Sequence, residues 1–178
     1  RGLGDVYKRQ PFGYRKDPED KNHLLIDEET APIVRRLFAW ALEGHGPNYI
    51  RRRLEEEKIP CPTYWNRVRG FRNVSTKWEK KDPVNGRYMW DFSVIKDILM
   101  NPVYTGAIAS QKKEYRFKIG TIGEKKPEDW IVVENQHEPI VDRKTFDIVQ
   151  RKLKSRQRPR QTGEISLFAG LITVSYTH

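Results

Sequence analysis

Apolar residues recur at helical spacing in four stretches of the chain, with polar or charged residues between them. In the first stretch, Val34, Leu37, Phe38 and Ala41 fall on one face of a helix. The same pattern predicts helices over about residues 33–43, 48–58, 92–100 and 143–155. Each of these helices would bury one stripe of side chains and expose the rest.

Capping and turn residues support these limits. Asp27 or Thr30 can cap the first helix, and Asp91 and Asp142 can cap the last two. Pro47 stands where a proline fits the first turn of the second helix. Because each aspartate suits a helix start, we interpret them as caps and not as an acidic metal-binding triad.

The second half of the chain contains short apolar and aromatic runs in place of a helical repeat. Residues 103–110 predict a strand, residues 115–119 its partner, and residues 130–133 a third strand. Residues 64–89 lack periodicity and predict a long loop. The expected fold class is α+β: a helical N-terminal half, followed by a small antiparallel sheet and a closing helix.

Composition and charge narrow the class of protein. The 178-residue chain has a formal net charge of +10, which is typical of a protein that binds a polyanion such as nucleic acid. Its single cysteine, Cys61, excludes an intramolecular disulfide and a multi-cysteine zinc site within these residues. No run of about 18 apolar residues is present, so we expect no membrane partner and a cytoplasmic location.

Five separated motifs carry the most specific signal. They are PFGY (11–14), DEETAPIVRRLFAWALEGHG (27–46), YIRRRLEEEKIPCP (49–62), FSVIKDILMNPVYTGAI (92–108) and HEPIVDRKTFDIVQRKL (137–153). Together they resemble the recombinase domain of the large serine recombinases, the phage integrases and transposon resolvases of that family. Any one motif is weak alone, whereas five in the right order over roughly residues 10–153 are specific.

The resemblance implies that this chain is one part of a larger recombinase. In the family, an N-terminal domain carries the nucleophilic serine, and a zinc ribbon follows the recombinase domain. The residues that would match these parts are not found here, so the resemblance assigns this chain no catalytic residue, no activity of its own and no cofactor. Zinc is expected in the downstream ribbon, and other recombinase subunits would be contacted through the missing domains.

The same resemblance divides the chain into four segments. Residues 1–10 are interpreted as non-native or linker residues, and residues 11–155 as the DNA-binding recombinase domain. Residues 156–166 would form a basic linker. LFAGLI at 167–172 resembles the lead-in to the ribbon, so residues 167–178 would be the truncated start of the zinc-ribbon region with a non-native end.

Three basic segments are candidates for contact with double-stranded DNA. The predicted loop interleaves basic and aromatic side chains, the strand region adds a basic hairpin, and the last helix leads into a basic tail. Lysine and arginine neutralise phosphates, and arginine can also donate to a guanine edge. The candidate DNA-binding residues are Arg67, Arg69, Arg72, Lys77, Lys80, Lys81, Arg87, Lys112, Lys113, Arg116, Lys118, Arg151, Lys152, Lys154, Arg156 and Arg158.

Each segment also has an ordinary structural explanation. The loop would then be a solvated surface whose aromatic residues enter the core, the strand lysines would protect a sheet edge, and the tail would be a linker. The arginines at 51–53 are followed at once by glutamates at 55–57. Pairs such as Arg51 with Glu55 would leave that helix face electrically balanced.

The sequence therefore predicts the DNA-binding domain of a site-specific serine recombinase that recognises attachment-site duplex DNA for integration or recombination. Its location would be cytoplasmic, and nucleoid-associated when DNA is bound. Phosphate contacts would fix its register, and side chains from residues 64–89 or 92–100 would read bases in the major groove. The alternatives are a single-stranded nucleic-acid-binding module that stacks bases on Tyr and Trp, an autonomous nuclease, and a fragment whose affinity lies in the ribbon.

Overall fold

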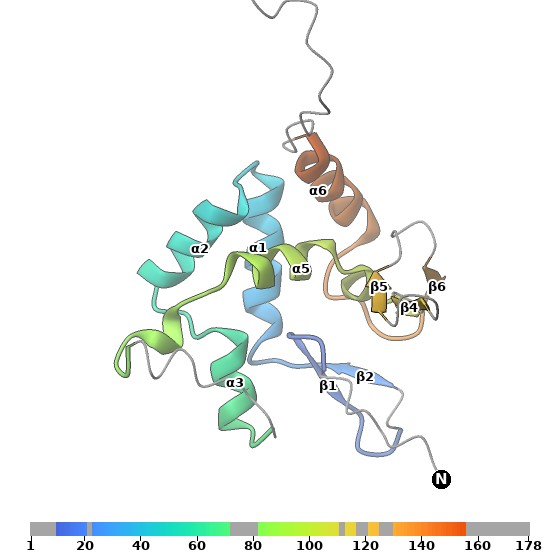
Figure 1. Cartoon of the computed structure of the whole chain (residues 1–178), viewed down its shortest axis with the longest axis horizontal. Coiled ribbons are helices and arrows are strands. Elements are labelled where there is room, and N and C mark those ends of the chain that lie inside the picture. The colour runs from blue at the N-terminus through green and yellow to red at the C-terminus, as the bar shows by residue number, and fades with distance from the viewer. Residues whose placement is uncertain are drawn as a thin grey trace, which may run out of the picture.

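The computed structural model describes residues 10–20, 23–71, 82–110, 113–116, 121–124 and 130–155. Helices dominate this part and a helix closes it, which confirms the predicted α+β class (Figure 1). Its elements in chain order are β1 (Tyr14–Lys16), β2 (Leu24–Ile26), α1 (Ala31–Leu42), α2 (Pro47–Glu56), α3 (Pro62–Val68), η1 (Gly86–Tyr88), α5 (Phe92–Met100), η2 (Pro102–Thr105), β3 (Ile108–Ser110), β4 (Lys113–Arg116), β5 (Thr121–Glu124), β6 (Ile131–Val133) and α6 (Arg143–Ser155).

α1 lies at the centre of the helical body, between α2 and α6 (Figure 1). Its Val34, Leu37 and Phe38 are buried, as the apolar spacing predicted. The Phe38 ring meets the rings of Tyr104 in η2 and Phe146 in α6, with centroid distances of 5.9 and 6.1 Å. Apolar side chains from α1, η2 and α6 therefore meet in one core, whose removal from water stabilises the fold.

The predicted caps of the last two helices are confirmed. The Asp91 carboxylate accepts a hydrogen bond from the Ser93 N–H at 2.9 Å, and the Asp142 carboxylate accepts one from the Thr145 N–H at 2.9 Å.

Along α5, the sequence spacing predicts an apolar stripe of Phe92, Ile95, Ile98 and Leu99. The last three are buried as predicted, but the prediction is wrong for Phe92, which is 43% exposed. Phe92 is the first residue of α5, and the buried residues of this helix all follow it.

The prediction of one long loop over residues 64–89 is wrong in its described part, which contains most of α3 and all of η1. α3 ends in a Schellman arrangement, in which Gly70 has a φ of +74°. The N–H of Gly70 donates to the carbonyl oxygen of Arg67 at 2.9 Å, and that of Phe71 donates to Asn66 at 3.0 Å. These bonds satisfy the last carbonyls of a helix too short to show an apolar period.

Within the described residues the strands form three two-stranded antiparallel pairs, β1 with β2, β3 with β6, and β4 with β5. The strand predicted over residues 103–110 is wrong in its first half, where η2 lies, and only its end is extended. The partner predicted at residues 115–119 is also wrong, because β3 pairs with β6. The strand predicted at residues 130–133 is confirmed as β6.

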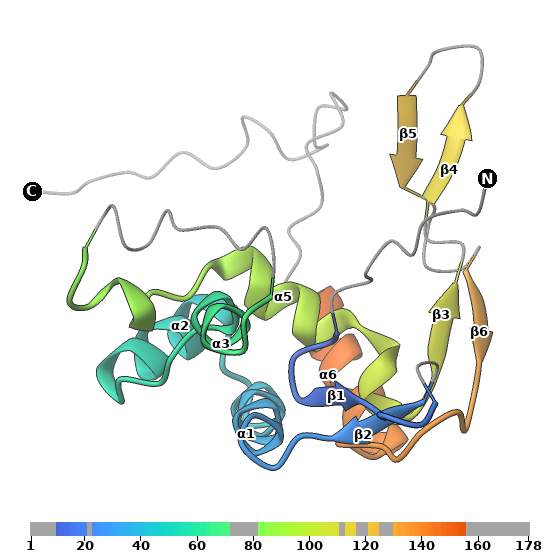
Figure 2. The same ribbon diagram turned by 90° about the horizontal axis from the view of Figure 1, so that it is seen from below.

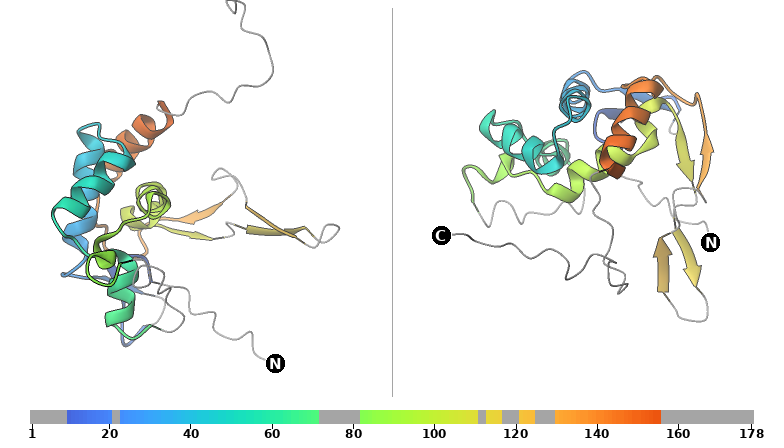
Figure 3. Two further views of the ribbon diagram at one scale, coloured as in Figure 1. Left: turned by 60° about the vertical axis from the view of Figure 1, so that its left-hand side comes forward. Right: turned by 90° about the horizontal axis from the view of Figure 1, so that it is seen from above.

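The two ribbons of the second half stand out from the helical body. Figure 2 shows β3 and β6 leaving the body, with β4 and β5 farther from the helices in the same direction. The two views in Figure 3 agree with this arrangement. All three side chains of β6 are exposed. The four strands therefore form projecting ribbons, and the side chains of β3 and β6 add little to the buried core.

The PFGY motif is held in the core by a polar network. The Tyr14 hydroxyl donates to the carbonyl oxygen of Glu138 at 3.0 Å and accepts from the N–H of Ile140 at 3.2 Å. Burial raises the pKa of Tyr14 to about 12, so the hydroxyl keeps its proton. The Tyr104 hydroxyl donates to the carbonyl oxygen of Phe12 at 2.9 Å. The N-terminal hairpin is thereby joined to η2 and to the residues before α6.

His137 completes this network as a neutral imidazole. Its ring is buried, meets the Tyr14 ring edge to face at 4.8 Å, and donates from Nε2 to the carbonyl oxygen of Val103 at 2.8 Å. Its Nδ1 is buried and has no hydrogen-bond partner among the residues that the structure describes. Burial lowers the pKa of His137 below its ordinary value.

The free energy of unfolding should therefore fall in mild acid. In the unfolded chain His137 takes up a proton near its ordinary pKa of about 6.5, whereas the folded chain resists protonation until a lower pH. The stabilisation is complete above the ordinary pKa of about 6.5, declines as the pH falls from there toward the lower pKa of the folded chain, and does not change further below it. Urea unfolding at about pH 7.5 and pH 5.5 should show the loss. His137→Gln, whose amide can replace the Nε2 donor, should reduce this pH dependence, and parallel pH profiles for the two proteins would contradict the assignment.

Candidate nucleic-acid interface

α3 is a short helix with no buried residue of its own. Pro62 occupies its first position, where the missing N–H has no helical partner to lose. The buried Cys61 just before it donates its N–H to the carbonyl oxygen of Arg87 at 2.8 Å. Tyr64 packs against the core. The N-terminal end of α3 is thus anchored, and its position at the other end depends on a different contact.

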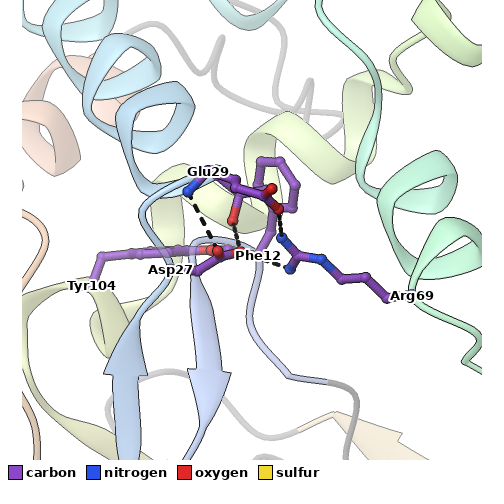
Figure 4. A network of polar contacts seen from close by, with 6 residues as sticks. Phe12, Asp27, Glu29, Arg69 and Tyr104 are labelled. Carbon is purple, nitrogen blue, oxygen red and sulfur yellow. Dashed lines mark hydrogen bonds and ion pairs between the residues drawn. The ribbon is translucent and has the colours of Figure 1, made fainter.

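That contact is made by Arg69, at the C-terminal end of α3 (Figure 4). Its Nη1 lies 2.6 Å from Oδ2 of Asp27, and its Nη2 lies 2.8 Å from Oε2 of Glu29. The Thr30 hydroxyl donates to the same Asp27 oxygen at 2.5 Å. The Arg69 guanidinium also lies over the Trp65 ring, 5.3 Å from its centroid. We call Arg69, Asp27 and Glu29 the carboxylate clamp, which joins α3 to the turn between β2 and α1.

The clamp is charged at neutral pH. Burial alone would raise the pKa of the Asp27 carboxyl, but hydrogen bonds from Thr30 and Arg69 outweigh burial and hold that pKa below its usual range. Burial opposes the charge of Arg69 as well, yet the two carboxylates raise its pKa. Thr30, and not Asp27, is the N-cap residue of α1. The Asp27 carboxylate therefore binds Arg69 in the clamp as well as making hydrogen bonds near the start of the helix.

The predicted contacts in the region of α3 differ in their surroundings. Arg67 is exposed, and so are Val68 and Phe71, the latter 39% exposed. Arg69 is engaged by the clamp. Arg87, in η1, is half-buried, and its guanidinium lies 4.8 Å from the centroid of the Tyr88 ring. Of the described residues near α3, Arg67 is therefore the predicted contact with the most accessible side chain.

Other predicted contacts lie on α6 and β4, away from α3 (Figure 1). Arg151 and Lys154 are exposed on α6. Lys152 instead donates from Nζ to the carbonyl oxygen of Leu42, the last residue of α1, at 2.5 Å. Lys113 and Arg116 begin and end β4, where the backbone register pairs them with β5. The described candidates thus form three groups and not one continuous site.

The remaining candidates stay predictions, because they lie outside the described residues, as do the proposed linker and ribbon segments at 156–178 and residues 1–9. They are Arg72, Lys77, Lys80, Lys81, Lys112, Lys118, Arg156 and Arg158.

Arg51 and Arg53 of α2 form ion pairs with nearby glutamates, as the structural explanation of this segment predicted. Arg51 and Glu55 form an ion pair at 2.8 Å, one helical turn apart. Arg53 lies 3.3 Å from Glu57, which also pairs with Arg36 of α1. The predicted i,i+4 pairing is confirmed, and local carboxylates balance much of the charge on this helix.

A groove between α2, α5 and α6 was not predicted from the sequence. Phe92, Met100 and Leu153 line it, together with the lysines Lys96 and Lys154. The signal available in the sequence was Lys96, which falls on the polar side of the helix predicted over residues 92–100. The exposure of Phe92 is known from the structure alone. Lys96, which was not among the predicted DNA contacts, therefore lines the same groove as Lys154, which was.

Two features are absent from the described residues. No three His, Cys, Asp or Glu side chains among them are grouped so that they could hold a metal ion. None of the helices in this part of the chain is both long and apolar enough to cross a bilayer.

Comparison with protein-family models assigns the chain to a family. The model described as Recombinase matches residues 28–156, which is well over half of the chain. The chain belongs to the Recombinase family. The matched part of this recombinase domain includes Glu29 and Arg69 of the clamp, and Asp27 directly precedes it.

The recombinase domain is also similar to a curated protein and to solved structures. It is 38% identical over 86 residues to the uncharacterized protein YefB of Bacillus subtilis (strain 168), covering 47% of this chain and 28% of that protein. A crystal structure of an LSR–DNA complex matches with a TM-score of 0.45 and 21% identity, covering 83% of this chain and 32% of that chain. A structure from work on the sequence requirements of the Listeria innocua prophage attP site matches with a TM-score of 0.48 and 18% identity, covering 83% and 43%. The chain thus spans less than half the length of each of these relatives.

Proposed function

We propose that this recombinase domain binds duplex DNA at the attachment site of a site-specific serine recombinase. The family match over residues 28–156 carries the proposal. The formal net charge of +10 supports a polyanionic partner, because each phosphate that is neutralised releases condensed counterions. The order of the five motifs supports the serine class of recombinases.

The described surface suggests how such binding would work. Exposed Arg67 would meet the DNA, with Val68 and Phe71 beside it, and the exposed basic residues of α6 would add phosphate contacts. Phosphate contacts would fix the orientation of the domain, and contacts with base edges would set its sequence preference.

Strand exchange would be performed by other parts of the protein. The family resemblance places the nucleophilic serine, and the covalent phosphoserine link to DNA, in a separate domain, with zinc in the ribbon and subunit contacts outside this chain. The chain itself would position that machinery and cleave nothing. Incubation of the chain with supercoiled plasmid and Mg²⁺ tests this point, since sustained cleavage would favour the nuclease alternative.

Duplex binding can be measured by fluorescence anisotropy with a labelled duplex that the full chain enriches from a randomised library. The association constant should fall linearly with salt on logarithmic axes, with a slope of about −0.9 for each phosphate neutralised. Binding to the enriched duplex should exceed binding to its separated strands. Equal affinity for both would favour the single-strand alternative, and no binding by a demonstrably folded chain would end the proposal.

An arginine substitution locates the interface. Arg67→Gln should weaken binding to the enriched duplex by roughly 1 kcal/mol or more, through loss of a phosphate or base contact. Arg52→Gln is the matched control, because Arg52 is also an exposed arginine but lies on the charge-balanced α2. Equal losses for the two variants would show that only net charge matters and that α3 has no particular role.

The single-strand alternative receives no support from three of the tryptophans that the structure describes, Trp40, Trp65 and Trp90. Trp90 is buried, where its ring meets Phe12 at a centroid distance of 5.8 Å. Trp65 and Trp40 lie under the guanidinium groups of Arg69 and Arg36. Bases could not stack on these ring faces without displacing existing contacts.

A further inference from the structure

α3 depends on the carboxylate clamp more than the other helices depend on any single contact. α1, α2, α5 and α6 each bury at least two side chains, whereas α3 buries none. Its N-terminal end is joined to η1, and its C-terminal end reaches the rest of the fold through Arg69. The direction of α3, and so of its exposed Arg67, should follow the geometry of the clamp.

Arg69 is poorly suited to touch DNA itself. Its two terminal nitrogens contact two different carboxylates, and one of these belongs to Asp27, which is only 6% exposed. If Arg69 turned toward a phosphate, the Asp27 carboxylate would stay buried without its cation. Leaving a buried charge without its partner is strongly unfavourable. Arg69 is positively charged and lies near the proposed interface, but it would affect DNA binding through its contacts within the protein and not by touching DNA.

We propose that Arg69 is a positioning residue for DNA recognition: through Asp27 and Glu29 it fixes the direction in which α3 presents Arg67 to the duplex. The inference rests on the proposed function, because it gives α3 a role in duplex binding. Arg69 was among the residues predicted to contact DNA directly, and the clamp assigns it a different task.

Neutralising a clamp carboxylate separates the two roles by the sign of the effect. Removal of a negative charge makes the domain more positive, so electrostatics alone predicts tighter binding to DNA. If the clamp positions α3, the same substitution loosens the helix and weakens binding. The sign of the change in affinity therefore decides between positioning and simple charge.

Glu29→Gln in the full chain is the central variant, because the 65% exposed Glu29 side chain can be changed with little risk to folding. Glu28→Gln is its matched control: it makes the same charge change at the neighbouring exposed carboxylate, which is not one of the clamp residues. With the enriched duplex as probe, we expect binding about threefold weaker for Glu29→Gln, and unchanged or slightly tighter for Glu28→Gln.

Asp27→Asn and Arg69→Gln complete the test as a double-mutant cycle. Each should weaken binding about tenfold, and the double variant should bind about as well as Arg69→Gln alone, because both changes break one contact. Circular dichroism must show every variant folded at the assay temperature, so that affinity reports the position of α3 and not the folded fraction. Should Asp27→Asn fail to fold, the comparison of Glu29→Gln with Glu28→Gln still decides.

The outcomes separate this inference from the proposed function. If the wild-type chain binds no duplex, the proposed function fails. If the wild-type chain binds but Glu29→Gln matches Glu28→Gln, or folded Asp27→Asn binds more tightly, the positioning role is overturned and duplex binding stands. Additive losses in the cycle would likewise show that Arg69 acts independently of Asp27.

Discussion

Replacing Phe38 by alanine should lower the free energy of unfolding by about 4 kcal/mol, as is usual for large-to-small changes at buried aromatic positions. Phe38 is 1% exposed, and its ring lies between Tyr104 of η2 and Phe146 of α6. The substitution removes apolar contacts to both neighbours at once. Because α1 is also fixed by contacts with α2 and α5, it cannot simply move to fill the cavity.

Phe92→Ala is the matched control, since the substitution is the same and Phe92 is 43% exposed on α5. Its loss should be below about 1 kcal/mol, as is usual for surface positions. Urea unfolding followed by circular dichroism measures both variants against the wild-type chain. Similar losses at the two positions would mean that the core is not centred on α1.

The long helices could be predicted because their own residues determine them. The apolar spacing of α1, α2, α5 and α6 and the caps at Asp91 and Asp142 are local features, and the structure confirms them. α3 could not be found in this way, because seven residues are too few to show an amphipathic period. The signals that remained were Pro62 at its start and Gly70 after its end, the usual asymmetry of helix termini.

The strand prediction failed where a local turn overrode β propensity. Val103, Tyr104 and Ile108 favour strands, but the Asn101 side chain accepts a hydrogen bond from the Val103 N–H at 3.3 Å and starts η2. The predicted partner of β3 was wrong for another reason. β3 pairs with β6, although β4 and β5 follow β3 more closely in the sequence. Composition alone does not reveal such a choice of partner.

In the candidate site, too, some features follow from the local sequence and others only from tertiary contacts. An exposed arginine such as Arg67 could be selected from composition, because a basic segment needs no particular partner to be attractive to DNA. The role of Arg69 could not, since Glu29 lies 40 positions away and only the fold brings the two together. Sequence analysis can thus locate basic segments, whereas the assignment of direct and indirect roles requires tertiary contacts.

Gly106 marks the junction where η2 turns into β3, and there is no room at this position for a side chain. Its φ is +83°, and a Cβ built there would lie 2.7 Å from the carbonyl oxygen of His137. The Gly106 carbonyl oxygen accepts the N–H of Gln136 at 2.9 Å, so the two backbones are already in close contact. The buried His137 side chain limits how far that backbone can move away.

Gly106→Ala should therefore lower the free energy of unfolding by about 3 kcal/mol, of which roughly 1 kcal/mol reflects alanine at a positive φ and the rest displacement of the His137 backbone. Gly70→Ala isolates the first part, because Gly70 has a φ of +74° but nothing within 4 Å of its added Cβ. That variant should lose only about 1 kcal/mol in the same urea unfolding experiment. Equal losses would show that the contact with His137 is relieved at no cost, and that the junction between η2 and the residues before α6 is not tightly packed.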